Sequence, residues 1–88
     1  MNKFMWVKGH FYINGIRYLF NAKVFEQGSE FGINGGRISK LWIVKDITIN
    51  PWNYFVNCPV VNYDRGWDVE PRDENDIRAL NYVLNLYK

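Results

Sequence analysis

Rings and cations alternate near the start of the chain, at Trp6, Lys8, His10 and Tyr12. Residues two apart in a β-strand point to the same side of the sheet, so these four side chains would form one row. Bases of single-stranded nucleic acid stack on aromatic rings, and cations beside the rings contact the phosphates. This row is the first candidate for a binding surface, provided that the segment forms a strand.

Carboxylates gather in the second half of the chain, where Asp64, Asp68 and Glu70 lie within seven residues. Such a group is able to hold a divalent cation or to act as acid and base, so an enzyme built on it is one alternative. The commoner structure is a turn in which Asp64 bonds to nearby backbone, Arg65 pairs with a carboxylate and Trp67 packs beneath. We favour the turn, and therefore a protein that binds rather than catalyses.

The chain has one cysteine and one histidine, Cys58 and His10. A structural zinc site takes about four ligands, so this pair does not make one. Cys58 precedes Pro59 in an apolar run, and we interpret it as a buried, inert thiol. We expect no metal and no other cofactor.

Four of the seven glycines fall in residues 28–42, the stretch around which the chain is organised. A phosphate-binding P-loop needs Gly-Lys-Ser or Gly-Lys-Thr before a helix, and neither occurs here. We interpret the stretch as turns and a bulge of an antiparallel sheet, with a short strand over residues 30–33 and a tight turn at Asn34 and Gly35. The alternative is a backbone nest for an anion, helped by Arg37 and Lys40.

A hairpin is predicted to position the first row. Asn14 and Gly15 separate two β-rich runs, residues 5–13 and 16–24, and suit the positive φ angles of a two-residue type I′ turn. The turn fixes the register of the two runs. One face of the hairpin is then almost wholly apolar and should meet the core.

The opposite face of the hairpin adds further cations to the row. The second run contributes Arg17, Leu19, Asn21 and Lys23 to it. We predict that single-stranded nucleic acid binds there. The predicted contacts are Trp6, Lys8, Tyr12, Arg17 and Lys23, with Arg37 and Lys40 as further phosphate contacts. One alternative is a face buried against a second copy of the chain or another protein, and another is an ordinary sheet face whose lysines keep it soluble.

Two later segments have the composition of strands. Residues 37–44 are predicted to form a central strand, in which Ile38 and Trp42 share one face. Residues 54–63 return to β-type residues but contain Pro59, which cannot donate to a ladder. This second segment is therefore predicted to be an edge strand or a strand with a break.

The apolar period changes from two to about 3.6 residues after Asp73, which is a plausible N-cap. The face expected to be buried comprises Ile77, Leu80, Val83, Leu84 and Tyr87. We therefore predict one α+β domain over residues 1–88, an antiparallel sheet of about four strands followed by one C-terminal amphipathic helix packed on it.

The composition is that of an ordinary globular protein of 88 residues, with 48% hydrophobic and 23% charged side chains. The aromatic content of 18% is high, so several rings should lie near the surface. A lone cysteine makes no internal disulfide and favours a reducing, cytoplasmic setting. No apolar run is long enough to span a membrane, so we expect no membrane partner.

The net charge of +2 hides a split between the two halves of the chain. Residues 1–45 carry seven basic and two acidic residues, a net of +5, whereas residues 46–88 carry four basic and seven acidic residues, a net of −3. Such a split favours either a partner-binding face or two halves that attract each other in the fold.

Two segments, taken with the closing helix, resemble a known family. They are GSEFGINGGRISKLW at residues 28–42 and NYDRGWD at residues 62–68. The family comprises short uncharacterised proteins of Gram-positive bacteria, their phages and mobile elements, and it has no assigned activity. The order of strands before one helix is also similar to the positive-cofactor-four type of single-stranded-DNA-binding domain, which dimerises through its helix. That second likeness concerns the fold alone, and the acidic second half of this chain departs from it.

Overall fold

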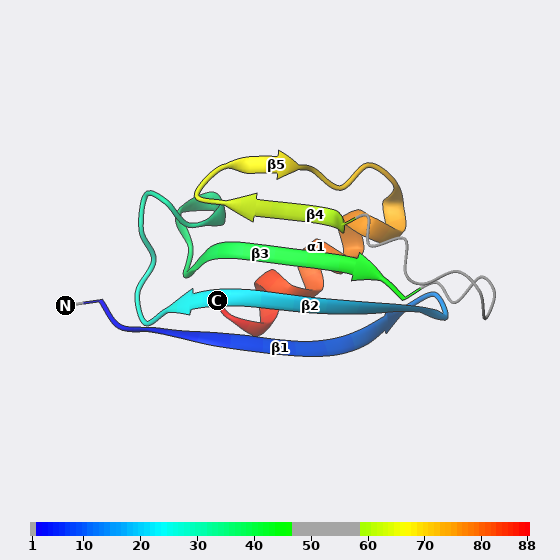
Figure 1. Ribbon diagram of the computed structural model, residues 1–88, viewed down its shortest axis with the longest axis horizontal. Helices are drawn as coiled ribbons and strands as arrows, with labels where there is room; N and C mark the ends of the chain where they lie inside the picture. The colour runs from blue at the N-terminus through cyan, green and yellow to red at the C-terminus, as the bar shows by residue number, and fades with distance from the viewer. Residues whose placement is uncertain (1, 47–58) are drawn as a thin grey trace.

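The computed structural model describes residues 2–46 and 59–88. Five strands form one antiparallel sheet in the order β1-β2-β3-β4-β5, so neighbours in the chain are neighbours in the sheet. The strands are β1 (Phe4–Ile13), β2 (Ile16–Phe25), β3 (Ile38–Lys45), β4 (Pro59–Asp64) and β5 (Trp67–Val69). The helix α1 (Glu74–Leu86) lies behind the sheet in Figure 1 and packs on one of its two faces. The predicted α+β class is confirmed.

The N-terminal hairpin has the predicted turn and register. Ile13 pairs with Ile16 across a turn in which Asn14 has a φ of 50° and Gly15 a φ of 78°. The ladder continues without a shift as far as Phe4 and Phe25. The two-residue turn thus aligns ten residues of each strand, and it places the apolar face towards α1.

The core lies between α1 and the face of the sheet that the hairpin's apolar side chains occupy. The sheet contributes buried Phe11, Tyr18, Phe20, Ala22, Val24, Leu41, Ile43, Val61 and Tyr63. The helix contributes Ala79, Leu80 and Val83, and Leu84 of the helix and its C-cap Tyr87 are partly buried. The prediction that Ile77 belongs to this face is wrong, because its side chain is 44% exposed.

Asp76 replaces Ile77 on the inner side of α1. It is buried, and its Oδ1 accepts a hydrogen bond of 2.9 Å from the Tyr18 hydroxyl. The Lys45 ammonium lies 3.1 Å from the same oxygen. The pKa of Tyr18 is raised, mainly by burial and secondly by its hydrogen bond to Asp76. Burial alone would lower the pKa of Lys45, but the hydrogen bonds and charges of Asp76 and Asp73 raise it overall.

Asp73 is the N-cap of α1, as predicted. Its Oδ1 accepts a hydrogen bond of 2.8 Å from the backbone N–H of Asp76. Its other oxygen lies 3.2 Å from the Lys45 ammonium. The backbone hydrogen bond and then the Lys45 contact lower the pKa of Asp73. One cation on β3 therefore fixes the start of the helix through two carboxylates.

The glycine stretch does not form the predicted strand over residues 30–33. Residues 26–37 instead make a compact loop that contains one turn of 3-10 helix, Ile33–Gly35. A Cβ at Gly32 would lie 1.9 Å from the Gly36 carbonyl oxygen. The loop closes on itself at a distance that only glycine permits, and this close backbone packing replaces strand pairing.

A bulge in β3 changes which of its residues face the core. Lys23 pairs with Lys40 but Val24 pairs with Ile38, so Ser39 is an extra residue in the ladder. Ile38 is consequently buried in the core instead of sharing the face of Trp42, contrary to the prediction. The Ser39 carbonyl accepts a hydrogen bond of 3.0 Å from the Arg65 N–H, which ties the β4–β5 turn to β3.

The fifth strand arises from the segment interpreted as an acidic turn. Asp64, Arg65 and Gly66 do turn, but Trp67 then pairs with Tyr63 and begins β5. A strand of three residues is too short for alternation to reveal it. Pro59 starts β4 and pairs with Val44 at a register shift. The predicted edge strand is wrong, because β4 lies between β3 and β5. Residues 47–58, which include Cys58 and the predicted start of that strand, lie outside the described residues.

Candidate nucleic-acid interface

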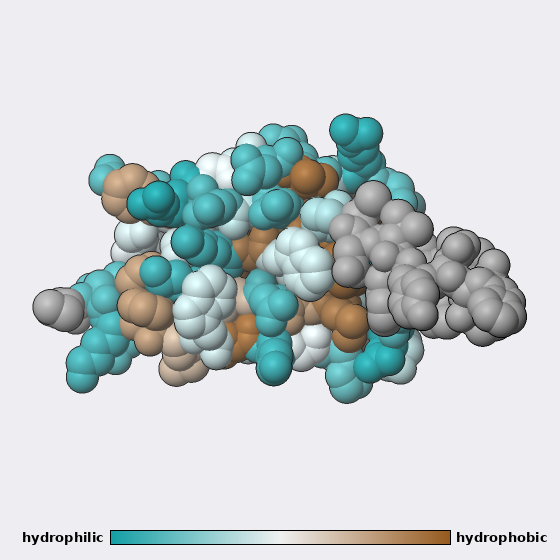
Figure 2. All heavy atoms as spheres, viewed as in Figure 1, coloured by the Kyte–Doolittle hydropathy of each residue, from teal (hydrophilic) through white to brown (hydrophobic). Residues whose placement is uncertain are grey.

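We define the outer face as the side of the sheet opposite α1, the side towards the viewer in Figures 1 and 2. The register places on it Phe4, Trp6, Lys8, His10 and Tyr12 of β1, Arg17, Leu19, Asn21, Lys23 and Phe25 of β2, Lys40, Trp42 and Val44 of β3, and Asn62 and Asp64 of β4. Figure 2 shows hydrophilic side chains scattered among paler and apolar ones over these strands. The predicted row of rings and cations therefore stands on a face that the helix does not cover.

Two rings of this row are accessible on β1. Trp6 is 60% exposed and Tyr12 is 61% exposed. Lys8 and His10 lie between them, and the rings of His10 and Tyr12 meet edge to face at 6.2 Å. Alternate residues of a strand are about 6.8 Å apart. A flexible chain laid along β1 would thus meet a ring, two basic side chains and a second ring in turn.

The cations of the outer face differ in how far their charge is already neutralised. Arg17 lies 2.9 Å from Asp46, and Lys40 lies 3.5 Å from Asp64. The Lys23 ammonium lies over the Phe4 ring, 4.1 Å from its centroid. Within residues 2–46 and 59–88, neither Lys8 nor Lys23 makes an ion pair.

The charge split of the sequence is partly used inside the fold. Four ion pairs join a base from residues 1–45 to an acid from residues 46–88, namely Arg17–Asp46, Lys40–Asp64, Lys45–Asp73 and Lys45–Asp76. The interpretation that the two halves attract each other is therefore supported. Lys8 and Lys23 on the outer face are not in these ion pairs, so the face keeps a positive charge.

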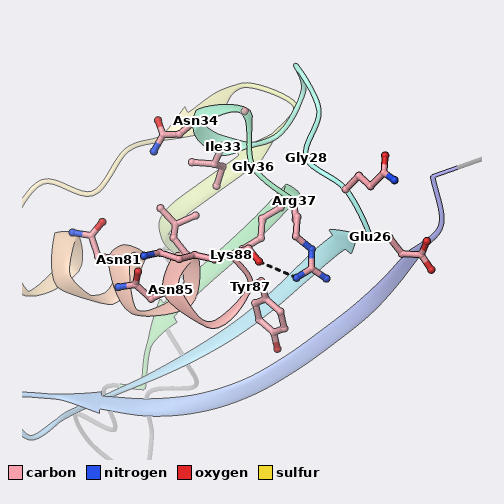
Figure 3. Close-up of a pocket in the computed structure, with 14 residues that line it drawn as sticks. Glu26, Gly28, Ile33, Asn34, Gly36, Arg37, Asn81, Asn85, Tyr87 and Lys88 are labelled. Atoms are coloured by element: carbon pink, nitrogen blue, oxygen red, sulfur yellow. Dashed lines mark hydrogen bonds between the residues drawn. The ribbon is translucent and has the colours of Figure 1, made fainter.

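Arg37 is not part of the outer face. Its Nε donates to the Phe25 carbonyl at 2.8 Å. Its Nη1 donates to the Lys88 carbonyl at 3.2 Å, the bond drawn as a dashed line in Figure 3. It lines a cleft of about 710 Å³ between the glycine stretch and the end of α1, with Asn81 and Asn85 across from it. The structure thus separates Arg37 from Lys40, and the two do not form one anion nest.

A smaller hollow lies at the end of the outer face where β2 and β3 meet the loops. It has a volume of about 450 Å³. Its lining comprises the cations Lys23, Lys40 and Arg65, the rings Phe25 and Phe31, the hydroxyls Ser29 and Ser39, and Asn2. We call it the basic hollow. Lys23 and Lys40 were predicted as contacts, but Arg65 was interpreted as the partner of a carboxylate.

Of the carboxylates Asp64, Asp68 and Glu70, the last two line one hollow of about 400 Å³, and Asp64 is not part of its lining. In the part of the chain that the structure describes, no three side chains of His, Cys, Asp or Glu gather closely enough to hold a metal ion. Asp64 instead neutralises Lys40 from β4. None of the helices among these residues is long and apolar enough to cross a membrane.

A comparison with protein families matches residues 5–88 to the model of a Domain of unknown function (DUF7678). The chain belongs to this family. The match covers all five strands of the DUF7678 protein except the first residue of β1, and it includes α1 and the lining cations of the basic hollow. No curated protein matches the chain, and no solved structure matches it. Membership of a family without an assigned function agrees with the resemblance found in the sequence.

Proposed function

We propose that this DUF7678 protein binds single-stranded nucleic acid through the outer face of its sheet. The observation that carries the proposal is the exposure of Trp6 and Tyr12 on either side of Lys8 on one strand. Stacking of a base on an exposed ring contributes about 1–3 kcal/mol and tolerates any base. The proposal is therefore of binding with little sequence preference.

The cations set the expected strength of binding. Lys8 and Lys23 have no carboxylate partner among the described residues, and Lys40 shares Asp64 with Arg65. Two or three phosphate contacts would make the logarithm of the association constant fall by about 1.4 to 2.1 per unit of log salt concentration. This slope is much smaller than that of a strongly basic protein, in keeping with the net charge of +2.

The test is a titration of labelled oligothymidine, followed by fluorescence anisotropy and by tryptophan emission in the same cuvette. We expect binding that weakens with salt at the slope above and quenches tryptophan emission, because Trp6 and Trp42 lie on the outer face. Arg78→Gln is the control for the loss of one positive charge away from the outer face, and it should bind like the unaltered protein. Arg78 is on α1 and pairs with Glu74 at 2.7 Å. Absence of binding at low salt would contradict the proposal.

A second function, association with another copy of the chain, is favoured by the edge of β1. The Lys3 carbonyl accepts a hydrogen bond from the Glu26 N–H, so the odd-numbered residues of β1 bond to β2. The N–H and C=O groups of the even-numbered residues then point to the open edge. Phe4, Met5 and Trp6 are each more than half exposed along it. Long apolar edges of this kind pair with further strands.

A pair of variants at one position tests this second function. Lys8→Pro removes an N–H from the open edge without removing a bond to β2, whereas Lys8→Ala removes the same charge and keeps the N–H. If copies pair through β1, light scattering should give a dimer mass for the Lys8→Ala variant and a monomer mass for the Lys8→Pro variant. A monomer mass for the unaltered protein at high concentration would contradict edge pairing.

A further inference from the structure

We infer that the basic hollow, lined by Lys23, Lys40 and Arg65, is a binding site for a phosphate group. The inference rests on the proposed function, since it names the place on the outer face where a phosphate of the nucleic acid is held. A phosphate group reaches such a site either as a phosphodiester of the strand or as a free phosphate or nucleotide. The chemistry is the same in both cases, and the experiment below separates the sources.

Three cations reach the hollow from three separate elements. Lys23 comes from β2, Lys40 from β3 and Arg65 from the β4–β5 turn. Lys23 pairs directly with Lys40, and like charges directly opposite each other destabilise a sheet. Asp64, which pairs with Lys40 on its other side, supplies one carboxylate, and no acidic residue is among the described residues that line the hollow. Three positive charges and one negative charge leave +2, which an oxyanion would offset.

Arg65 is the most exposed cation of the three. Its side chain is 67% exposed, and its Nε lies 3.9 Å from the Asp64 Oδ1, beyond hydrogen-bond length. An arginine fork matches the oxygens of a phosphate and binds two of them at once. The guanidinium therefore has donors to offer a ligand.

The backbone holds Arg65 in place at some cost. Its φ is 57°, a conformation that residues with a Cβ rarely adopt. Its backbone N–H donates to the Ser39 carbonyl at 3.0 Å, which ties the turn to β3 at the bulge. The same bulge brings Ser39 into the lining beside Lys40. Strain of this kind is kept where a side chain must be held at a site.

The remaining lining suits the groups attached to a phosphate. Ser29 and Ser39 carry hydroxyls, which donate to phosphate oxygens, and Phe25 and Phe31 carry rings on which a base or sugar packs. The volume of about 450 Å³ is within the usual range for ligand sites, about 300–1,000 Å³. The larger cleft at Arg37 fits an anion less well, because the acidic Glu26 lines it. The Arg37 guanidinium also donates already to two carbonyls.

The test follows backbone amide shifts by NMR while inorganic phosphate, and then thymidine 5′-monophosphate, is added to the full chain. We expect saturable shifts at Ser39, Lys40 and Arg65. Arg65→Gln and Lys40→Met should each raise the phosphate dissociation constant about tenfold, the effect of losing one charge-assisted bond. The charge control Arg78→Gln on α1 should leave it unchanged, and dispersed amide spectra show that each variant is folded. A response that does not saturate, or that survives both substitutions, overturns the inference.

Titration of oligothymidine with the same variants separates this inference from the proposed function. Oligothymidine binding that Arg65→Gln and Lys40→Met leave unchanged overturns the phosphate site and leaves the outer face as the interface. Saturable phosphate binding without oligothymidine binding supports the site and overturns the function. A 5′-phosphate that tightens oligothymidine binding supports a terminal monoester as the ligand, and equal affinity with and without it supports an internal phosphodiester.

Discussion

Asp76 decides which side of α1 faces the sheet. The spacing of apolar residues predicted Ile77 inside, yet the carboxylate of Asp76 is buried against Tyr18 and Lys45. Periodicity weighs hydrophobicity alone, and it has no term for a buried carboxylate that a hydroxyl and an ammonium satisfy together. The neighbouring cap at Asp73 was predictable because N-caps depend on local sequence.

The contacts among Asp73, Asp76, Tyr18 and Lys45 make the free energy of folding depend on pH at both ends of the scale. Asp73 has a folded pKa below its usual 3.8, so the stability it contributes is present above that value and is lost as the pH falls through the folded pKa. Tyr18 and Lys45 have folded pKa values above the usual 10.0 and 10.5, so their contributions are lost as the pH rises beyond those values. Urea unfolding between pH 3 and 11 should show a plateau with a decline at each end. A decline that begins near neutral pH would contradict this account.

The chemistry of the outer face was only partly predictable at the level of residues. Trp6, Lys8 and Tyr12 follow from alternation along one strand, and the structure places them on the exposed face. The positions of Arg65 in the basic hollow and of Arg37 away from the outer face could not be predicted from this alternation. Which side of the molecule each of them reaches depends on the turn and the loop that carry them.

Among the elements, the N-terminal hairpin was the most predictable and the glycine stretch the least. A two-residue turn fixes a register by itself, whereas the loop over residues 26–37 takes its shape from backbone atoms packed against one another. The bulge at Ser39 and the three-residue β5 were missed because each depends on pairing between strands that are distant in sequence.

Two alanine substitutions test the account of the glycine loop. A Cβ at Gly32 would lie 1.9 Å from the Gly36 carbonyl oxygen, whereas a Cβ at Gly66 would meet nothing within 4 Å. Gly32→Ala should lower the free energy of unfolding by about 1–3 kcal/mol or more, as overpacking does. Gly66→Ala, the control, should change it by less than about 0.5 kcal/mol. Equal effects in urea unfolding would show that the loop does not depend on this close approach.

At the scale of the whole molecule, ion pairs between the two halves of the chain neutralise some cations and leave others on the outer face. Asp46, Asp64, Asp73 and Asp76 of the second half pair with Arg17, Lys40 and Lys45. The outer face keeps cations that these acids do not neutralise, next to rings that the helix does not cover. The sequence showed the split of charge, but its use inside the fold required the contacts between strands and helix.

The most direct test of the proposed interface compares two tryptophan variants in the oligothymidine titration. Trp6→Ala removes an exposed ring from the outer face, whereas Trp67→Leu removes a ring from β5 that pairs with Tyr63 on the side of the sheet facing α1. We predict that Trp6→Ala weakens binding about 5- to 150-fold, the equivalent of about 1–3 kcal/mol for one stacked base, and that Trp67→Leu has little effect. Equal affinities for Trp6→Ala and the unaltered protein, with both folded, would contradict the outer face as the nucleic-acid interface.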